Sequence, residues 1–152
     1  MGLMSFFKGV GEKIFGHKEE AAPVAEKEAL KASALLAHVQ KLALPFNSLT
    51  IKIAGDTVTI DGEVDSQEDA EKIALAVGNV EGVHIVDNQL LVANPEPEAQ
   101  FHTVVSGDSL SKIAKEYYGD MMKYPVIFEA NKPMLTHPDK IYPGQVLRIP
   151  AL

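Results

Sequence analysis

Histidine is the commonest metal-binding side chain, and the chain has five, at positions 17, 38, 84, 102 and 137. No two of them have the spacing of an H-E-x-x-H helix, in which two imidazoles reach the same zinc ion. The chain also lacks cysteine, so neither thiolate ligands nor disulfides are available. These counts predict no zinc centre.

Three acidic residues, Asp61, Glu63 and Asp65, have the first, third and fifth positions of an EF-hand calcium loop. Ser66 stands where that loop needs its turn glycine, and Lys72 stands where it needs its bidentate glutamate. We interpret the acids as the polar end of a hairpin and the cap of a helix.

Residues 107–111, Gly-Asp-Ser-Leu-Ser, contain part of a G-x-S-x-G nucleophile elbow but not its last glycine. No base and orienting pair stands nearby, and the sequence has no complete Walker A or G-x-G-x-x-G phosphate loop. We interpret Ser109 as a helix cap and expect no enzymatic activity.

Residues 78–83, Gly-Asn-Val-Glu-Gly-Val, directly follow a predicted helix, where the last carbonyls lack partners and the macrodipole is negative. The two glycines would allow several carbonyl oxygens to converge, and neutral oxygens without clustered carboxylates suit K⁺ better than Ca²⁺ or Mg²⁺. The alternative is a helix cap with Gly78 in the left-handed conformation. The residues alone leave both interpretations open.

The pattern of residues 24–92 predicts an α+β sandwich with both helices on one face of the sheet. Segments of helical and of two-residue apolar periodicity follow in the order α-β-β-α-β. The predicted elements are a helix over 26–42, a hairpin over 49–60 with its turn at 54–56, a helix after Ser66 and a strand over 84–92. Ser66 with Asp69, or Asp65 with Glu68, would cap the second helix.

Residues 1–23 form a separate N-terminal docking segment in this interpretation, with a polar, proline-ended stretch at 17–23 as its border. Its apolar residues recur at helical spacing, but three glycines weaken an isolated helix. The segment therefore needs a surface on which to dock. We expect that surface to be the protein itself, because only Lys8 and Lys13 are available to meet acidic lipid.

Residues 93–99 contain two prolines and two glutamates and predict a linker. Residues 100–152 then predict a β-α-α-β unit of about fifty residues. Its first strand begins near Phe101, its second helix tolerates Pro125 in the first turn, and Pro143-Gly144 turns the chain into a last strand over 146–149.

Both parts resemble known families. Residues 49–64 (LTIKIAGDTVTIDGEV) and 80–90 (VEGVHIVDNQL) are similar to a BON domain, with coverage of about residues 25–92. Residues 103–110 (TVVSGDSL), 127–131 (IFEAN) and 141–150 (IYPGQVLRIP) resemble a LysM domain.

The whole arrangement, a Met-Gly-Leu start, Gly11-Glu-Lys13, one BON domain and one C-terminal LysM domain, resembles the bacterial cytoplasmic potassium-binding proteins. The resemblance implies a monomer that binds one K⁺ through main-chain carbonyls, becomes more compact on binding, and supports growth under potassium or osmotic stress. The ions Rb⁺, Cs⁺ and NH₄⁺ are further candidates. The family's ligating carbonyls fall here on Phe7, Val10, Glu12, Gly78, Val80 and Val83.

The net charge of −7 is uneven, with eight bases against sixteen acids in residues 1–100 and six against five in 101–152. Such an acidic body disfavours nucleic acid. No apolar run is long enough to span a membrane and no signal peptide is recognisable, so we expect a cytoplasmic protein. Two alternatives remain: binding of peptidoglycan or N-acetylglucosamine by residues 107–110 and 141–143, and membrane association of the BON domain. A protein partner that reads the bound form is unknown.

Overall fold

The computed structural model describes residues 2–16 and 23–152. The chain divides into two compact units, residues 1–96 and 97–152. Most of the stretch at 17–23 that we predicted as a border lies outside the described residues.

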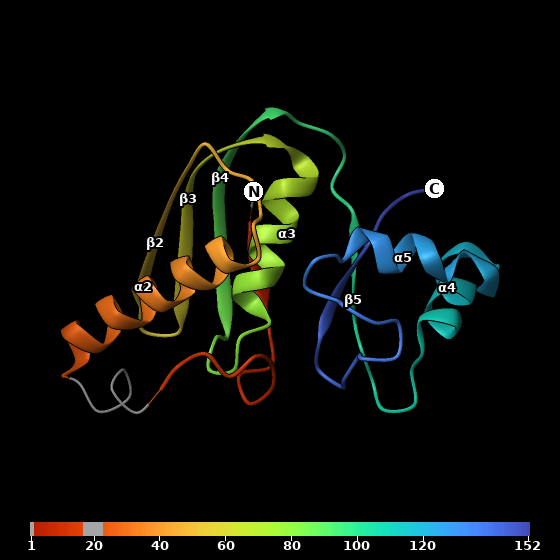
Figure 1. The fold of residues 1–152 in the computed structure, drawn as a ribbon, viewed down its shortest axis with the longest axis horizontal. Coiled ribbons are helices and arrows are strands. Elements are labelled where there is room, and N and C mark those ends of the chain that lie inside the picture. The colour runs from red at the N-terminus through yellow and green to blue at the C-terminus, as the bar shows by residue number, and fades with distance from the viewer. Residues whose placement is uncertain (1, 17–22) are drawn as a thin grey trace. The chain divides into compact units, whose positions relative to one another are not determined.

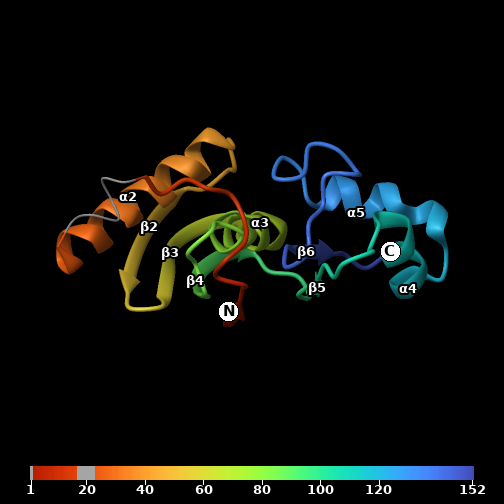
Figure 2. The ribbon, with the colours of Figure 1, turned by 90° about the horizontal axis from the view of Figure 1, so that it is seen from below.

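The first unit is a four-stranded mixed sheet with the strand order β1-β4-β3-β2. Its strands pair β1 with β4 and β2 with β3 in antiparallel register, and β3 with β4 in parallel. Figure 2 shows both helices on the same face of the sheet, as the α-β-β-α-β pattern predicted. The elements are β1 (Leu3–Ser5), α2 (Val24–Lys41), β2 (Ser48–Ala54), β3 (Thr57–Ser66), α3 (Gln67–Gly78) and β4 (Ile85–Asn94).

The alternation along β3 shows why this face is covered. Val58, Ile60 and Val64 are buried beneath the helices, whereas the intervening Asp61 and Glu63 are exposed. This alternation is what a half-buried strand requires. The acidic residues of the incomplete calcium pattern therefore lie on the solvent face of the sheet.

Local contacts fix the ends of these elements. The Ser66 hydroxyl accepts a hydrogen bond of 3.0 Å from the Asp69 N–H, so the cap is formed by Ser66 and Asp69. The hairpin turn contains Gly55 at φ 61°, and its N–H donates to the Glu28 carboxylate at 2.9 Å. Helix α2 is thereby attached to the turn between β2 and β3.

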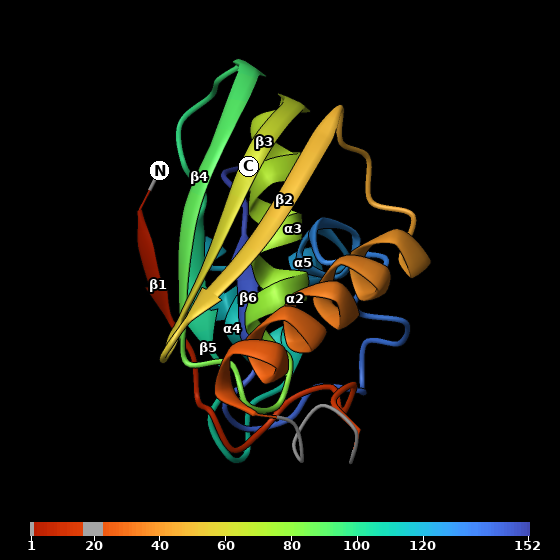
Figure 3. The ribbon, with the colours of Figure 1, turned by 90° about the vertical axis from the view of Figure 1, so that its left-hand side faces the viewer.

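The described part of the N-terminal segment contributes an edge strand to the sheet. The helical spacing of its apolar residues does not produce a helix, because Leu3–Ser5 instead form strand β1 at the edge of β4. Figure 3 shows β1 beside β4. The segment does dock on its own protein, since Leu3 pairs with Asp87 and Ser5 with Ile85.

The second unit is a β-α-α-β arrangement, as predicted. Strands β5 and β6 pair in antiparallel register, and the helices pack on them around buried Ile113, Ile127 and Leu147. Ser109 caps the first helix by accepting from the Lys112 N–H, which confirms its structural role. The elements are β5 (Gln100–Thr103), α4 (Leu110–Tyr118), a 3₁₀ turn (Met121–Lys123), α5 (Tyr124–Ala130) and β6 (Val146–Ile149).

None of the helices in the described parts of the chain has both the length and the apolar character needed to cross a bilayer.

A largely buried histidine–aspartate pair organises the loop after β5. The His102 Nε2 lies 2.9 Å from the Asp108 carboxylate, and its Nδ1 lies 3.1 Å from the Tyr117 hydroxyl. The same carboxylate accepts from the Val105 N–H at 3.0 Å. Burial on its own would raise the pKa of Asp108, but the hydrogen bonds from His102 and Val105 outweigh it and hold the pKa below its ordinary 3.8.

This arrangement predicts acid sensitivity of the second unit. A depressed carboxyl pKa contributes stability above the unfolded-state pKa, and that stability is lost as the pH falls through 3.8 towards the folded-state pKa. All four tyrosines lie in residues 117–142, so tyrosine fluorescence in urea reports this unit within the full chain.

We expect Asp108→Asn to lower stability near neutral pH and to flatten the decline below pH 3.8. The control is Asp139→Asn, because the Asp139 side chain is 92% exposed. An acid profile of Asp108→Asn that matches the wild type would show that the pair does not cause the sensitivity.

Candidate functional site

Residues 2–16, here called the N-terminal arm, lie against residues 79–84, here called the α3–β4 loop. Main-chain hydrogen bonds join the two segments: the Phe6 N–H donates to the His84 carbonyl at 2.7 Å, and the Gly82 N–H donates to the Lys8 carbonyl at 2.7 Å. In Figure 1 the arm (red) and the loop (green) lie side by side at one end of α3. The arm therefore crosses the C-terminal end of that helix.

A second set of bonds extends this contact along the arm. Glu12 and Val80 form a parallel β-bridge, in which the Glu12 N–H donates to the Asn79 carbonyl at 2.8 Å and the Glu81 N–H donates to the Glu12 carbonyl at 2.9 Å. Gly11 has φ 120°, and a Cβ built on it would lie 2.2 Å from the Asn79 carbonyl oxygen. Only glycine permits this close approach of two backbones.

The six carbonyls that the family resemblance singles out all lie on these two adjoining stretches of chain. Three come from the arm, and three come from the end of α3 and the loop after it. They belong to Phe7, Val10, Glu12, Gly78, Val80 and Val83. The side chains of these six residues give no sign that their carbonyls lie on adjoining segments, because the groups concerned are main-chain atoms.

The hydrogen bonds divide these carbonyls into two groups. The oxygens of Glu12 and Val80 accept from the N–H groups of Glu81 and Val83 at 2.9 and 3.1 Å, and that of Phe7 accepts a long bond of 3.4 Å from Val10. The carbonyls of the other three, at positions 10, 78 and 83, accept no hydrogen bond from any residue that the structure describes.

Unpaired carbonyls are unusual inside a protein, because losing water without gaining a partner costs free energy. Gly78 is buried and Val83 is only 2% exposed. A bound cation would supply the missing partner for both oxygens. Carbonyls that already accept one hydrogen bond keep a second lone pair for an ion.

The end of α3 adds a favourable field for a cation. Helix C-termini carry partial negative charge, which basic residues in the last turn commonly offset. The last turn of α3, all of which the structure describes, holds no basic residue, whereas α2 has Lys41 and α4 has Lys115 there. The negative end of this dipole therefore remains uncompensated by its own helix.

The expectation of a left-handed Gly78 is wrong. Gly78 is the last residue of α3, and the cap residue that follows, Asn79, has φ −80°. A Cβ at Gly78 would lie 2.0 Å from the Phe6 ring, so the absent side chain makes room for that ring. The loop glycine with positive φ is Gly82, at 99°. Sequence reasoning counted Phe6 among the apolar residues that dock the arm, but it did not pair Phe6 with Gly78.

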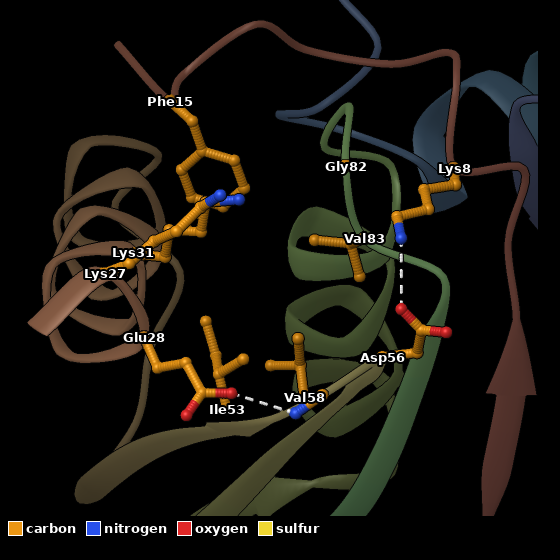
Figure 4. Close-up of a pocket in the computed structure, with 11 residues that line it drawn as sticks. Lys8, Phe15, Lys27, Glu28, Lys31, Ile53, Asp56, Val58, Gly82 and Val83 are labelled. Atoms are coloured by element: carbon orange, nitrogen blue, oxygen red, sulfur yellow. Dashed lines mark hydrogen bonds and ion pairs between the residues drawn. The ribbon is translucent and has the colours of Figure 1, made fainter. Parts of the chain in front are cut away.

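A pocket of about 300 Å³ lies beside the α3–β4 loop, between it and α2 (Figure 4). At one side the Lys8 ammonium forms an ion pair of 3.0 Å with Asp56, whose pKa this hydrogen bond lowers. At the other side the Lys31 ammonium lies 4.8 Å from the centre of the Phe15 ring. The Lys8 side chain thus ties the arm to the β2–β3 turn.

Across residues 2–16 and 23–152, no group of three or more His, Asp or Glu side chains could hold a metal ion. A site made from three or more such side chains is therefore absent from this part of the chain. The arm and the α3–β4 loop are joined by main-chain hydrogen bonds, so main-chain groups of both segments lie close together.

We predict that Gly11→Ala disturbs this junction. The new Cβ would meet the Asn79 carbonyl, and the positive φ is strained for alanine, so we expect a loss of at least about 1–2 kcal/mol in stability. Gly9→Ala is the matched control, since no atom lies within 4 Å of its Cβ position. Urea unfolding followed by circular dichroism measures both. Equal stability of the two variants would contradict the close packing at Gly11.

Family comparisons agree with the two-unit fold. The BON domain model matches residues 27–94, and the LysM domain model matches residues 102–150. An uncharacterized protein of Deinococcus radiodurans is 40% identical over 118 residues, which are 69% of this chain and 45% of that protein. An esterase of Mycobacterium tuberculosis is 36% identical over 114 residues but is matched over only 24% of its length.

A further relative matches from end to end. The potassium binding protein Kbp of Escherichia coli O6:H1 is 46% identical over 151 residues, which are 99% of this chain and 99% of that protein. Its coverage includes both the arm and the α3–β4 loop. The chain therefore belongs to the family of BON–LysM proteins that contains Kbp.

Proposed function

We propose that this protein binds one K⁺ in the cytoplasm, through main-chain carbonyls at the junction of the N-terminal arm and the α3–β4 loop. The observation that carries the proposal is the 46% identity to a potassium binding protein over 99% of both chains. Gly78 and Val83 are buried, and their carbonyls accept no hydrogen bond from the residues that the structure describes, which supports the location.

The chemistry of the junction favours a large monovalent ion. Carbonyl oxygens carry partial charge only, and rings of them replace the hydration shell of K⁺ in channel filters. Protein sites for Ca²⁺ and Mg²⁺ usually include carboxylate ligands. In the described part of the chain, no three or more acidic or histidine side chains lie together as metal ligands would. We therefore expect K⁺ and ions of similar size to bind in preference to divalent ions.

The proposed shell is made by the carbonyls of Phe7, Val10, Glu12, Gly78, Val80 and Val83. Three of them accept no hydrogen bond from described residues and would gain their first partner from the ion. The other three would use a second lone pair. The arm supplies half of this set, so ion binding and docking of the arm are linked.

Because of this linkage, ion binding would change the fraction of molecules in which the arm is docked. A ligand that binds only the docked arm shifts the arm's equilibrium towards that form. We propose that the chain becomes more compact as a result, and that this response supports growth when potassium is scarce or osmotic pressure changes. A partner would then distinguish the two forms by shape.

Thermal unfolding tests ion binding directly. At one ionic strength, KCl should raise Tm in a saturable way while NaCl and choline chloride should not, because screening is then constant. Binding to the native state predicts about 2.7 kcal/mol of stabilisation at a hundred times Kd, which corresponds to several degrees. Coincident melting curves in the three salts would refute the proposal.

Compaction is tested separately by small-angle X-ray scattering of the full chain. We expect a smaller radius of gyration in KCl than in NaCl at matched ionic strength. If K⁺ binds by calorimetry but the two scattering profiles superimpose, the compaction part of the proposal is wrong and the binding part is unaffected.

A further inference from the structure

Phe6 differs from every other residue in the described arm. Its side chain is 4% exposed, whereas Leu3 is 70% exposed and Phe7 is 59% exposed. No other residue between positions 2 and 16 is buried. Phe6 is therefore the one side chain of the described arm that is buried, beside the arm's main-chain bonds and its Lys8 ion pair.

The ring enters a space that only a glycine can provide. A Cβ on Gly78 would lie 2.0 Å from Cζ of Phe6, and 2.2 and 2.3 Å from its Cε atoms. Gly78 has no positive φ, so no turn requires a glycine at this position. Glycine is also a poor helix former, and its presence in the last turn of α3 is explained by the tip of this ring.

The backbone of Phe6 is held as firmly as its ring. Its N–H donates to the His84 carbonyl at 2.7 Å, and its carbonyl lies 2.9 Å from His84 Nδ1. Because a carbonyl can only accept, the Nδ1 atom donates in this contact. Phe6 is thus attached to α3 through its side chain and to the α3–β4 loop through both main-chain groups.

These contacts lie between the two halves of the proposed cation site. Phe7, which follows directly, supplies a carbonyl from the arm, and Gly78, which the ring touches, supplies one from the end of α3. We infer that Phe6 is the positioning residue that seats the arm on α3 and so assembles the K⁺ site. This inference rests on the function proposed above.

The consequence is a quantitative link between the ring and affinity. If the arm leaves α3, half of the proposed carbonyls leave with it. The apparent affinity for K⁺ then equals the affinity of the docked form multiplied by the fraction of molecules that are docked. A variant in which about one molecule in ten is docked should therefore bind K⁺ about tenfold more weakly. The pairing of β2, β3 and β4 and both helices should persist, because apart from Phe6 the buried core of this unit comes from residues outside the arm.

The test compares Phe6→Ala with Leu3→Ala in the full chain. Leu3 is an apolar residue of the same arm, but its side chain is exposed. Its main chain makes none of the hydrogen bonds that involve the proposed ligand residues. Calorimetric titration with KCl, at constant ionic strength in choline chloride, should show a loss of about tenfold or more for Phe6→Ala and unchanged affinity for Leu3→Ala.

Hydrogen exchange supplies a readout that general destabilisation would not produce. The N–H groups of Glu81 and Gly82 donate to arm carbonyls, so their protection reports arm docking. In Phe6→Ala these two amides should exchange faster, while amides in the β3–β4 pairing keep their protection. Loss of protection throughout the sheet would contradict a positioning role.

A second variant changes the other partner of the contact between Phe6 and Gly78. Gly78→Ala leaves the arm sequence intact but places a methyl group where the ring lies, and we expect the same loss of affinity and of protection at Glu81 and Gly82. Wild-type affinity in both Phe6→Ala and Gly78→Ala would overturn the positioning role while leaving K⁺ binding established. Absence of K⁺ binding by the wild type would overturn the proposed function and this inference with it.

Discussion

The main-chain contact between the N-terminal arm and the α3–β4 loop is the constraint on which the proposed cation site depends. The hydrogen bonds from Gly82 to Lys8 and from Glu81 to Glu12 bring two strands of backbone together at the negative end of a helix dipole. Without these bonds the carbonyls of the arm would face water. With them, main-chain groups from positions about seventy residues apart lie next to each other.

A site made from main-chain carbonyls restricts the residue type at positions other than those of its ligands. The ligands proposed here are main-chain oxygens and do not depend on side-chain identity, so the positions whose residue type matters are those that let the backbones approach. Gly11 lies against the Asn79 carbonyl, and Gly78 lies against the Phe6 ring. Phe6 is the counterpart of the second glycine, which gives one aromatic side chain control over the geometry of several main-chain atoms.

Local patterns were sufficient to predict most of the fold. Two-residue alternation identified the β2–β3 hairpin, helical periodicity identified α2 and α3, and Ser66 and Ser109 cap the helices that they were expected to cap. These features depend on neighbours within a few residues. The same local reasoning failed at the arm, because β1 has only three residues and exists through its pairing with β4.

The candidate site was less accessible to physical reasoning from the sequence. The end of α3 could be recognised as favourable to a cation, but the participation of the arm followed from family resemblance and not from periodicity or spacing. Gly78 illustrates the reason: its role is set by Phe6, seventy-two positions earlier, and a glycine at the end of a helix more commonly signals a left-handed cap. The identity of the ligating carbonyls stays a prediction.

The most direct measurement is a crystal structure with Rb⁺ substituted for K⁺, since the anomalous scattering of rubidium locates the ion without reference to its ligands. The account predicts one strong anomalous peak at the junction of the arm with the α3–β4 loop, within ligand distance of the carbonyls of Val10, Gly78 and Val83. A peak held by carboxylates elsewhere, or occupancy in the LysM unit alone, would contradict it.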